Sequence, residues 1–467
     1  MPTAAEPEGD VLLVTSPYAG TRLSGPQHIA ISSYWFASNV LWGAMLLIIL
    51  PSQVEAIASH FLGVLPRALA NNPDWYTRWS YEITTDKGKA LGIIGSAVAI
   101  VSLLVPLIAG AVSDRCMARW GRRRPFMAAG SALSIGALLL MYFAGQAMLM
   151  WWFMAAYCLM ATGNNIATAA YSGVIPDLVP EDQRGIASGY MAMMSQVGTL
   201  VGAFAAGFIG SKHLLGAYLL IIFCIAAFTL LTMLGIQENP LVGKPAKLRW
   251  GAYAKSLWID PRKYPDFAWV WITRFLVMLG FYAVEPFIRY YLHDVIGIAD
   301  PDKTAAILLA VILVGATFSG MYGGYLSERI GRKKVVYVSN VVIAVMCLLL
   351  ILCRTLPQAL TVGVLFGLGY GAYVSVDWAL GTDVLPSKRD AGKDMAVWHI
   401  SMTLPQSITP LIAGYFLLGA FGSSTFKAAS GEMTRSYPAS GYALVFGMAA
   451  LFFLLGAVFL RNVKKAR

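Results

Sequence analysis

Long apolar runs alternate with short polar stretches along nearly the whole chain. Six runs lie at about residues 29–62, 89–113, 125–147, 150–176, 184–210 and 214–236, and six more at about 266–294, 303–327, 335–353, 356–385, 391–421 and 440–460. A helix of roughly 20 apolar residues is long enough to cross a bilayer. The pattern predicts an all-α membrane protein with about twelve transmembrane helices.

A polar, proline-containing stretch in the middle divides the runs into two sets of six. We expect a flexible cytoplasmic leader at 1–28, an N-terminal six-helix bundle at 29–236, a cytoplasmic linker at 237–265, a C-terminal six-helix bundle at 266–461 and a cytoplasmic tail at 462–467. The first run is too long for one perpendicular helix, so either Pro51 kinks it or its tail rises above the bilayer. Residues 64–88 then form an insertion on the outer face.

Composition and charge place the protein in a membrane. Hydrophobic residues make up 58% of the chain and charged residues 13%, against about 25% charged residues in soluble domains. Most of the 35 Lys and Arg residues fall on alternate loops and the C-terminal tail, a distribution that places both termini in the cytoplasm. The net charge of +11 therefore reflects orientation, and no nucleic-acid partner is expected. We expect a multi-pass monomer in the lipid bilayer of the cell (inner or plasma) membrane.

Two loop motifs recur in the two halves. Asp114-Arg115 precedes Gly121-Arg122-Arg123-Arg124, and Glu328-Arg329 precedes Gly331-Arg332; likewise Asp177 and Asp383 each lie three residues before a proline. Such recurrence indicates a duplicated chain, and repeated halves around a central cavity are typical of transporters. We expect these loops to gate by latching the bundles in the outward-open state, through Asp114, Arg115, Arg122, Arg123, Asp177, Glu328, Arg329, Arg332 and Asp383. The alternative is that their charges only fix the topology.

The first loop, from Asp114-Arg115-Cys116 to Gly121-Arg122-Arg123-Arg124-Pro125-Phe126, resembles the loop between helices two and three of the major facilitator superfamily. With Asn164-Asn165 twelve residues before Asp177, it is similar to the sucrose transporter and glycoside–pentoside–hexuronide:cation symporter branch, which includes animal proton-linked sugar transporter relatives. The resemblance implies the major facilitator fold. Plant sucrose transporters carry an aspartate, the implied proton carrier, three residues before the paired asparagines. Here that residue is Ala161, so any proton coupling must use another group or be absent.

Ionisable residues inside spanning segments are costly, by ~2.5–3.5 kcal/mol on insertion scales, and invite a functional interpretation. Glu285 follows Arg274 by about 16 Å of helix, near mid-membrane. Arg289 comes one turn later, on the same face, where the two can pair. We interpret Glu285 as a proton-coupling carboxylate; a structural ion pair is the alternative.

Asp377 and Trp378 in the tenth helix suit a sugar site, because carboxylates accept hydroxyl protons and aromatic rings cover C–H faces. The alternative is an aspartate satisfied by a neighbouring helix beside a packing tryptophan. His399 either relays protons or bonds to a neighbour. The predicted substrate-binding residues are Asn39, Trp42, Asn164, Asn165, Glu285, Asp377, Trp378, His399 and Gln406, and the predicted coupling residues are Glu285 and Asp377.

We therefore expect a secondary active transporter that takes up a sugar, a glucoside or disaccharide such as sucrose or maltose, with protons by alternating access. The chain contains no phosphate-binding loop for ATP. It also shows no metal-ligand or nucleophile–base spacing, so we expect no enzyme activity, metal or cofactor. Two alternatives stay open: another solute such as an organic cation or polyamine, or a non-transporting assembly or sensor protein.

Overall fold

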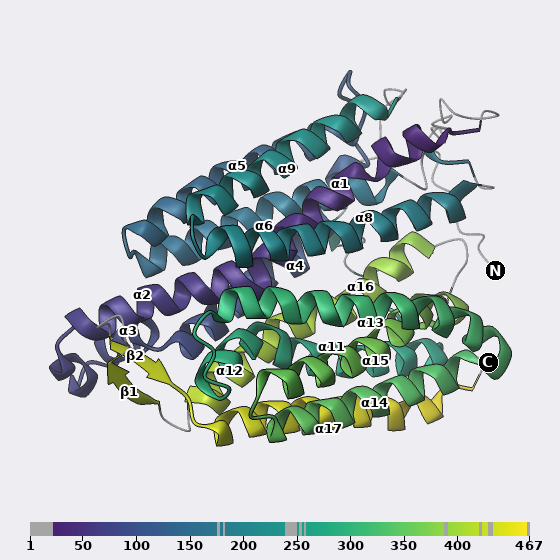
Figure 1. Cartoon of the computed structure of the whole chain (residues 1–467). Coiled ribbons are helices and arrows are strands. Elements are labelled where there is room, and N and C mark those ends of the chain that lie inside the picture. Colours follow the sequence, from purple (N-terminus) through teal and green to yellow (C-terminus); the bar gives the residue numbers. More distant parts are fainter. Residues whose placement is uncertain are drawn as a thin grey trace.

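Two bundles of helices lie against each other in the computed structural model (Figure 1), which describes residues 22–174, 178–180, 183–238, 250–251, 255, 258–386, 391–419, 423–427 and 433–464. The N-terminal bundle contains α1 (Gly25–Ala44), the π-helix η1 (Met45–Ile49), α2 (Leu50–Val64), η2 (Arg67–Asn71), α3 (Trp75–Thr85), α4 (Lys87–Ser113), α5 (Arg124–Gln146), α6 (Met150–Ser172), α8 (Arg184–Phe204), the π-helix η4 (Ala205–Gly210) and α9 (Leu214–Gly235).

The C-terminal bundle contains α11 (Pro265–Val284), η5 (Glu285–Phe287), α12 (Ile288–Asp294), α13 (Pro301–Ile330), α14 (Arg332–Leu352), α15 (Leu356–Asp383), α16 (Ala391–Pro410), the π-helix η6 (Leu411–Leu418), β1 (Ser424–Lys427), β2 (Met433–Ser436), α17 (Ala439–Phe459) and η7 (Leu460–Asn462). The strands form an antiparallel hairpin in which Ser424 is opposite Ser436 and Lys427 is opposite Met433. Strand β2 packs on α2 of the other bundle.

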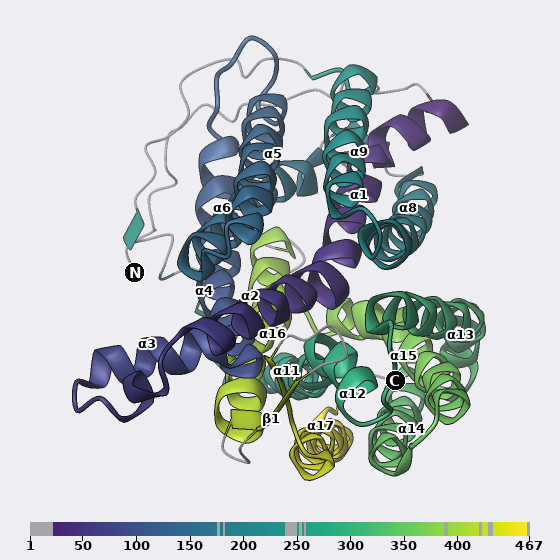
Figure 2. The ribbon, with the colours of Figure 1, turned by 60° about the vertical axis from the view of Figure 1, so that its left-hand side comes forward.

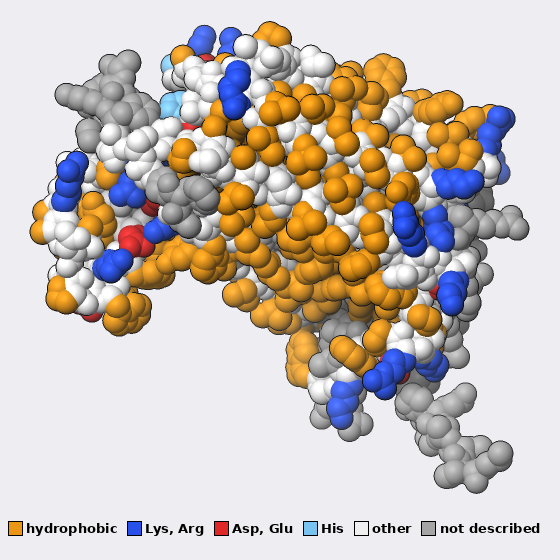
Figure 3. All heavy atoms as spheres, turned by 90° about the horizontal axis from the view of Figure 1, so that it is seen from below, with side chains coloured by type: hydrophobic (Ala, Val, Ile, Leu, Met, Phe, Trp, Pro, Cys, Tyr) orange, Lys and Arg blue, Asp and Glu red, His pale blue; other side chains and the backbone are white. Residues whose placement is uncertain are grey.

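The predicted membrane fold is confirmed. Within the described residues, ten helical segments are long and apolar enough to span a bilayer. Two further long segments, α6 and α16 continued by η6, carry more polar residues and complete a set of twelve. Viewed from below, a broad apolar surface covers the middle of the molecule, and Lys and Arg gather toward its two ends (Figure 3). This distribution is what a lipid belt requires.

The first spanning segment is one continuous helix from Gly25 to Val64, 40 residues long. At ~1.5 Å per residue it measures about 60 Å, roughly twice the hydrocarbon thickness of a bilayer. Pro51 does not end this helix. The π-helix Met45–Ile49 directly before it has a wider hydrogen-bond pattern, which accommodates the backbone hydrogen bond that proline cannot make. The insertion at residues 64–88 follows as η2 and α3, and α3 packs against α2 and α4.

The two ends of the molecule differ. At one end, on the left of Figure 1, α2 and α4 of the N-terminal bundle meet α12 and β2 of the other. The polar contacts described between the bundles involve residues 51–59 and 86–88 on one side and 289–302 and 434–437 on the other. We call this the closed end. The loops at 114–123 and 328–332 lie at the opposite end, here called the loop end. Figure 2 shows the bundles from a second direction, with α2 of one bundle and α16 of the other near the boundary where the bundles meet.

Glycines allow close approach of helix backbones within each bundle. A Cβ atom at Gly202 of α8 would lie 2.1 Å from the carbonyl oxygen of Val40 on α1. In the other bundle, a Cβ at Gly371 of α15 would lie 2.0 Å from the carbonyl oxygen of Ala316 on α13. Because the obstacle at both positions is backbone, a larger residue must move a helix.

We expect Gly202→Ala to destabilise the folded protein by about 1–3 kcal/mol, since the added methyl group overpacks a helix crossing. The measurement is the thermal unfolding midpoint in detergent. Gly447→Ala on α17 is the matched control, because no atom lies within 4 Å of its added Cβ. Equal midpoints for the two variants would contradict the role assigned to this crossing.

Candidate functional site

Five charged side chains from both bundles meet at the closed end: Glu55, Lys87, Arg289, Asp294 and Asp302, here called the closed-end network. The Lys87 ammonium lies 2.6 Å from a Glu55 oxygen and 3.0 Å from an Asp294 oxygen. Arg289 donates to Glu55 and to Asp302. The Lys87 side chain is 2% exposed and that of Asp294 is 0% exposed. These ion pairs are therefore shielded from water, where charge pairing is stronger than on a surface.

Further contacts support this end. Tyr290 donates to the carbonyl oxygen of Pro51 at 2.9 Å, and its ring lies 4.7 Å from the Lys87 ammonium. Asp86 caps the N-terminus of α4 by accepting from the backbone of Gly88 and Lys89. Asp86 also accepts from the Tyr437 hydroxyl and from Arg435, at 3.2 Å for the latter. A helix cap of one bundle is thus bound by the hairpin region of the other.

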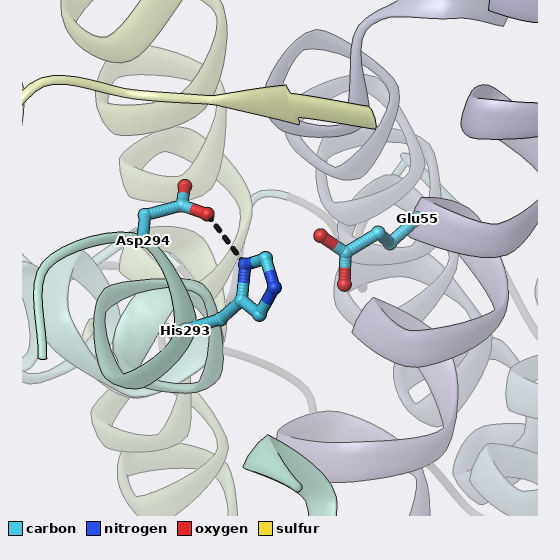
Figure 4. A group of neighbouring side chains, drawn as sticks. All are labelled: Glu55, His293 and Asp294. Atoms are coloured by element: carbon cyan, nitrogen blue, oxygen red, sulfur yellow. Dashed lines mark hydrogen bonds and ion pairs between the residues drawn. The ribbon is translucent and has the colours of Figure 1, made fainter. Parts of the chain in front are cut away.

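Glu55, His293 and Asp294 form a group with the spacing of metal ligands, and their ligand atoms lie within 4.8 Å of one another (Figure 4). His293 Nδ1 lies 2.9 Å from Asp294 Oδ1. The Lys87 ammonium bridges the two carboxylates of this group. Because a protein cation already compensates their charge, we interpret the group as part of the closed-end network and not as a metal centre.

A second buried ion pair joins helices inside the C-terminal bundle. Arg274 on α11 donates to Asp377 on α15, and the Tyr373 hydroxyl donates to the other Asp377 oxygen at 2.8 Å. The guanidinium also lies over the Trp398 ring, 4.7 Å from its centroid. Arg274 is 5% exposed and Asp377 is 7% exposed. The structure thus agrees with the alternative in which Asp377 is satisfied by a neighbouring helix.

Glu285 does not pair with Arg289, so that prediction is wrong. Glu285–Phe287 forms a 3-10 turn between α11 and α12, and its tighter winding changes the angle between the two side chains. Two carboxylates, Glu55 and Asp302, bind Arg289 instead.

In the described part of the chain, no cation pairs with the Glu285 carboxylate. Its Oε2 atom is buried and finds no hydrogen-bond partner among the described residues. Tyr157 of α6 lies within electrostatic reach of this carboxylate, as do Tyr282 of α11 and Tyr370 of α15. Glu285 therefore lies within electrostatic reach of tyrosines from both bundles, in a turn (η5) that contacts η1 of the N-terminal bundle.

The predicted asparagines bridge helices of the N-terminal bundle. Asn39 Oδ1 accepts from Ser195 at 2.9 Å, which joins α1 to α8. Asn164 Oδ1 accepts from Ser38 at 3.1 Å, and Asn165 donates to Ser102 of α4 at 3.0 Å. These bonds hold the helices together, and a direct role in substrate binding stays a prediction.

The remaining predicted binding residues are not joined to Glu285 by contacts that the structure describes. Trp42 is half-buried and packs against the apolar core. His399 is exposed on α16, and Gln406 is half-buried on the same helix. The side chain of Trp378 lies outside the described part of the chain. Binding by these residues stays a prediction.

The loop-end residues pair inside their own bundles. Arg123 lies 2.7 Å from Asp114, Arg115 donates to the carbonyl oxygen of Ala111, and Arg332 pairs with Asp383. Glu328 and Arg329 are exposed, and Arg329 lies over the Tyr325 ring. Arg122 belongs to the first loop, and Asp177 lies outside the described residues. The predicted latch between bundles concerns the other conformation and stays a prediction.

Two bundles of six spanning segments, with an ion-paired closed end and a central carboxylate, agree with a match to a known family. A sequence profile described as Major Facilitator Superfamily matches residues 29–410 and, in an overlapping match, residues 270–466. The chain belongs to the Major Facilitator Superfamily. It is therefore a membrane transport protein by family and not an enzyme, as predicted.

Solved superfamily structures share the fold. The nucleoside transporter NupG is 13% identical with a TM-score of 0.64, and the match covers 94% of this chain and 99% of NupG. A bacterial homologue of the human lysosomal transporter Spinster is 16% identical with a TM-score of 0.61, and the match covers 94% of this chain and 96% of the homologue. Identities this low support the fold and no particular substrate.

Two curated superfamily proteins are similar over part of their length. Sucrose transport protein SUC4 of Arabidopsis thaliana is 23% identical over 262 residues, which are 45% of this chain and 50% of that protein. The MFS transporter asaE of Aspergillus flavus is 29% identical over 212 residues, 45% of this chain and 47% of that protein. The chain spans about half the length of the curated relatives it matches.

Several charged residues that form buried ion pairs or hydrogen bonds in the structure were not identified from the sequence. Glu55 lies inside the first apolar run, where an ionisable residue is itself a signal. Lys87 begins the second spanning helix. Glu238, just after the sixth, accepts from the backbone N–H of Arg123 at 2.9 Å. Gly121 leaves room for it, with φ of 104° and no space for a Cβ atom.

We expect Arg274→Ala to destabilise the protein by about 3–5 kcal/mol, because it leaves the Asp377 carboxylate buried without its partner. The double variant Arg274→Met with Asp377→Leu removes both charges and should recover most of that loss. Thermal unfolding midpoints of the two variants and the parent provide the measurement. If the double variant were as unstable as the single one, the unpaired charge would not be the cause.

Glu238 should make the loop at residues 114–124 sensitive to pH. Burial raises the pKa of Glu238, although Arg123 and Arg124 act against the shift. A raised pKa means that the fold favours the protonated carboxyl, so its stabilising contribution is present at low pH and is lost as pH rises through that pKa. Glu238→Gln stays neutral and keeps an oxygen for the Arg123 N–H.

We therefore expect amide hydrogen exchange in this loop, corrected for the intrinsic rate, to become faster in the parent only as the pH rises above the ordinary titration range of a glutamate carboxyl, about pH 4. The amides of α14 provide an internal reference. A pH dependence that persists unchanged in Glu238→Gln would assign it to other groups.

Proposed function

We propose that this chain takes up a sugar together with protons by alternating access between its two bundles. The observation that carries the proposal is the buried Glu285 carboxylate, which has no cation beside it in the described part of the chain and lies between aromatic residues of both bundles. The partial similarity to a sucrose transport protein supports a sugar as the substrate.

The proposed orientation places the loop end in the cytoplasm. Basic residues concentrate on the loops of that end, as the positive-inside rule requires of a cytoplasmic face. The closed end then faces outward, so the ion pairs that join the bundles there close the protein toward the outside. In the opposite conformation the closed end opens, and the loop-end residues Asp114 and Glu328 act between the bundles.

Glu285 is the proposed proton carrier. A buried carboxylate without a partner is costly as an anion, and a bound proton removes that cost. Asp377 is already paired with Arg274 and accepts from Tyr373, so it does not carry the proton, and its binding of substrate hydroxyls stays a prediction. Phe281 and Tyr370 stack with ring centroids 4.8 Å apart and offer an aromatic surface for the apolar face of a sugar.

The location of Glu285 also bears on Ala161, which stands where the plant sucrose transporters carry an aspartate. Ala161 of α6 is fully buried in the apolar core. Tyr157, which interacts with Glu285, lies one helical turn before Ala161 and on the same face. A carboxylate from the C-terminal bundle thus approaches the face of α6 on which the resemblance implies an aspartate. We infer that Glu285 replaces that aspartate from across the interface.

A second candidate function follows from the same surroundings. A carboxylate without a cation, close to Tyr157, Tyr282 and Tyr370, is also suited to an organic cation, since aromatic rings attract positive charge. For such a solute, Glu285 would bind the substrate directly. A solute panel separates the two functions.

The test is uptake into proteoliposomes across a panel of glucosides, disaccharides and organic amines, with and without a pH gradient. We expect gradient-driven sugar uptake by the parent. In Glu285→Gln we expect driven uptake to fall by at least about tenfold, because the coupling proton contributes to it, while sugar counterflow remains. Glu82→Gln is the matched control, since Glu82 pairs with Lys89 and Arg78 outside the central region.

Each result has a distinct meaning. Unchanged driven uptake in Glu285→Gln would remove this residue from coupling. Sugar counterflow that ignores the gradient in the parent would refute proton coupling but keep the sugar. Uptake of amines alone would favour the second candidate, and no uptake of any solute would favour a non-transporting role.

A further inference from the structure

We propose that Lys87 and Arg289 are exchange residues of a gate at the closed end. Each binds one carboxylate of its own bundle and one of the opposite bundle, so both of these cations keep a carboxylate when the gate opens. The inference rests on the proposed alternating access, and it holds for any substrate.

The contacts of the two cations are divided in the same way. Lys87 binds Glu55 of its own bundle at 2.6 Å and Asp294 of the other bundle at 3.0 Å. Arg289 binds Asp302 of its own bundle and Glu55 of the other. Glu55 is therefore shared between Lys87 and Arg289. In the closed state Lys87 and Arg289 join the bundles through two ion pairs, Lys87–Asp294 and Glu55–Arg289. A third ion pair between the bundles, Arg435–Asp86 at 3.2 Å, lies at the same end.

Separation of the bundles breaks the pairs that cross between them and keeps the pairs of the closed-end network that lie within each bundle. Lys87 retains Glu55, and Arg289 retains Asp302. Asp294 retains the Tyr442 hydroxyl at 2.8 Å and the backbone N–H of Tyr437 at 3.1 Å, both from its own bundle. Every charge of the closed-end network thus has a partner on each side of the transition.

This division explains how a deeply buried network can serve as a gate. A buried charge that loses its only partner is strongly destabilising. An interface in which every charge had a single partner, on the opposite bundle, would therefore not open. A cation that binds two carboxylates in the closed state and keeps one of them in the open state never becomes a buried charge without a partner. Water that enters the opened end solvates the groups whose contacts across the interface are broken. The gate is consequently stable when closed and still able to open.

The division predicts opposite effects for two similar substitutions. Asp294→Asn weakens a contact that exists only in the closed state, so it should favour opening. Asp302→Asn weakens the ion pair between residue 302 and Arg289, which is the only carboxylate pair that Arg289 keeps in the open state. The substitution should therefore favour the closed state. The amide introduced by Asp302→Asn would keep an oxygen for Ser52, whose hydroxyl donates to Asp302 at 3.0 Å across the interface.

The experiment measures the spin-label distance between positions 60 and 440 by pulsed electron resonance in lipid nanodiscs. His60 and Ser440 are exposed at the closed end, one in each bundle, and the five native cysteines are replaced by alanine. We expect Asp294→Asn to raise the ratio of long to short distances by about tenfold or more, as loss of a charged hydrogen bond implies. Addition of Asp302→Asn to that variant should lower the ratio again.

Glu82→Gln serves as control, because Glu82 lies at the same end and pairs only with Lys89 and Arg78 of its own bundle in the described contacts; it should leave the ratio unchanged. An unchanged ratio in Asp294→Asn would overturn the proposal. So would a further rise on adding Asp302→Asn, because two weakened salt bridges would then simply add. The measurement requires neither sugar nor proton gradient, so its failure is separate from failure of the proposed function.

Discussion

The ion pairs between the bundles at the closed end are the contacts on which the rest of the structure depends. Elsewhere, the helices of each bundle are held by apolar packing, by hydrogen bonds and by the Arg274–Asp377 ion pair, and α4 packs on α16 of the other bundle. At the closed end, Glu55, Lys87, Arg289 and Asp294 join the halves where water is excluded. The hydrogen bonds between these charged groups are directional, so they favour one relative placement of the two bundles.

The fold was readable from the sequence because its cause is local. A bilayer requires about 20 apolar residues for each helix, and every span meets that requirement almost independently of its neighbours. The closed-end network has no such signature. Lys87 is 32 residues from Glu55 and 207 residues from Asp294, and nothing in either segment indicates the other.

The central residues show the same limit in finer detail. The sequence identified Glu285 and Asp377, since charge inside an apolar run is conspicuous. Their partners were predicted wrongly or not at all. Asp377 pairs with Arg274, which is 103 residues away in the sequence. Arg289 pairs with Glu55 and not, as predicted, with Glu285. The decisive element is a 3-10 turn of three residues, Glu285–Phe287. A change of winding this short falls below what a periodic pattern can resolve, yet it determines which carboxylate remains free.

The first helix is continuous, so it can transmit a movement from one end of the molecule to the other. Gly25 lies at its loop end, and Glu55 lies at the closed end of the same rod. Because the rod is continuous through the π-helix at Met45–Ile49, a tilt about its middle moves the two ends in opposite directions. In the proposed alternating access, closure of one end of the protein and opening of the other would then be a single displacement of this helix, with Glu55 at its far end.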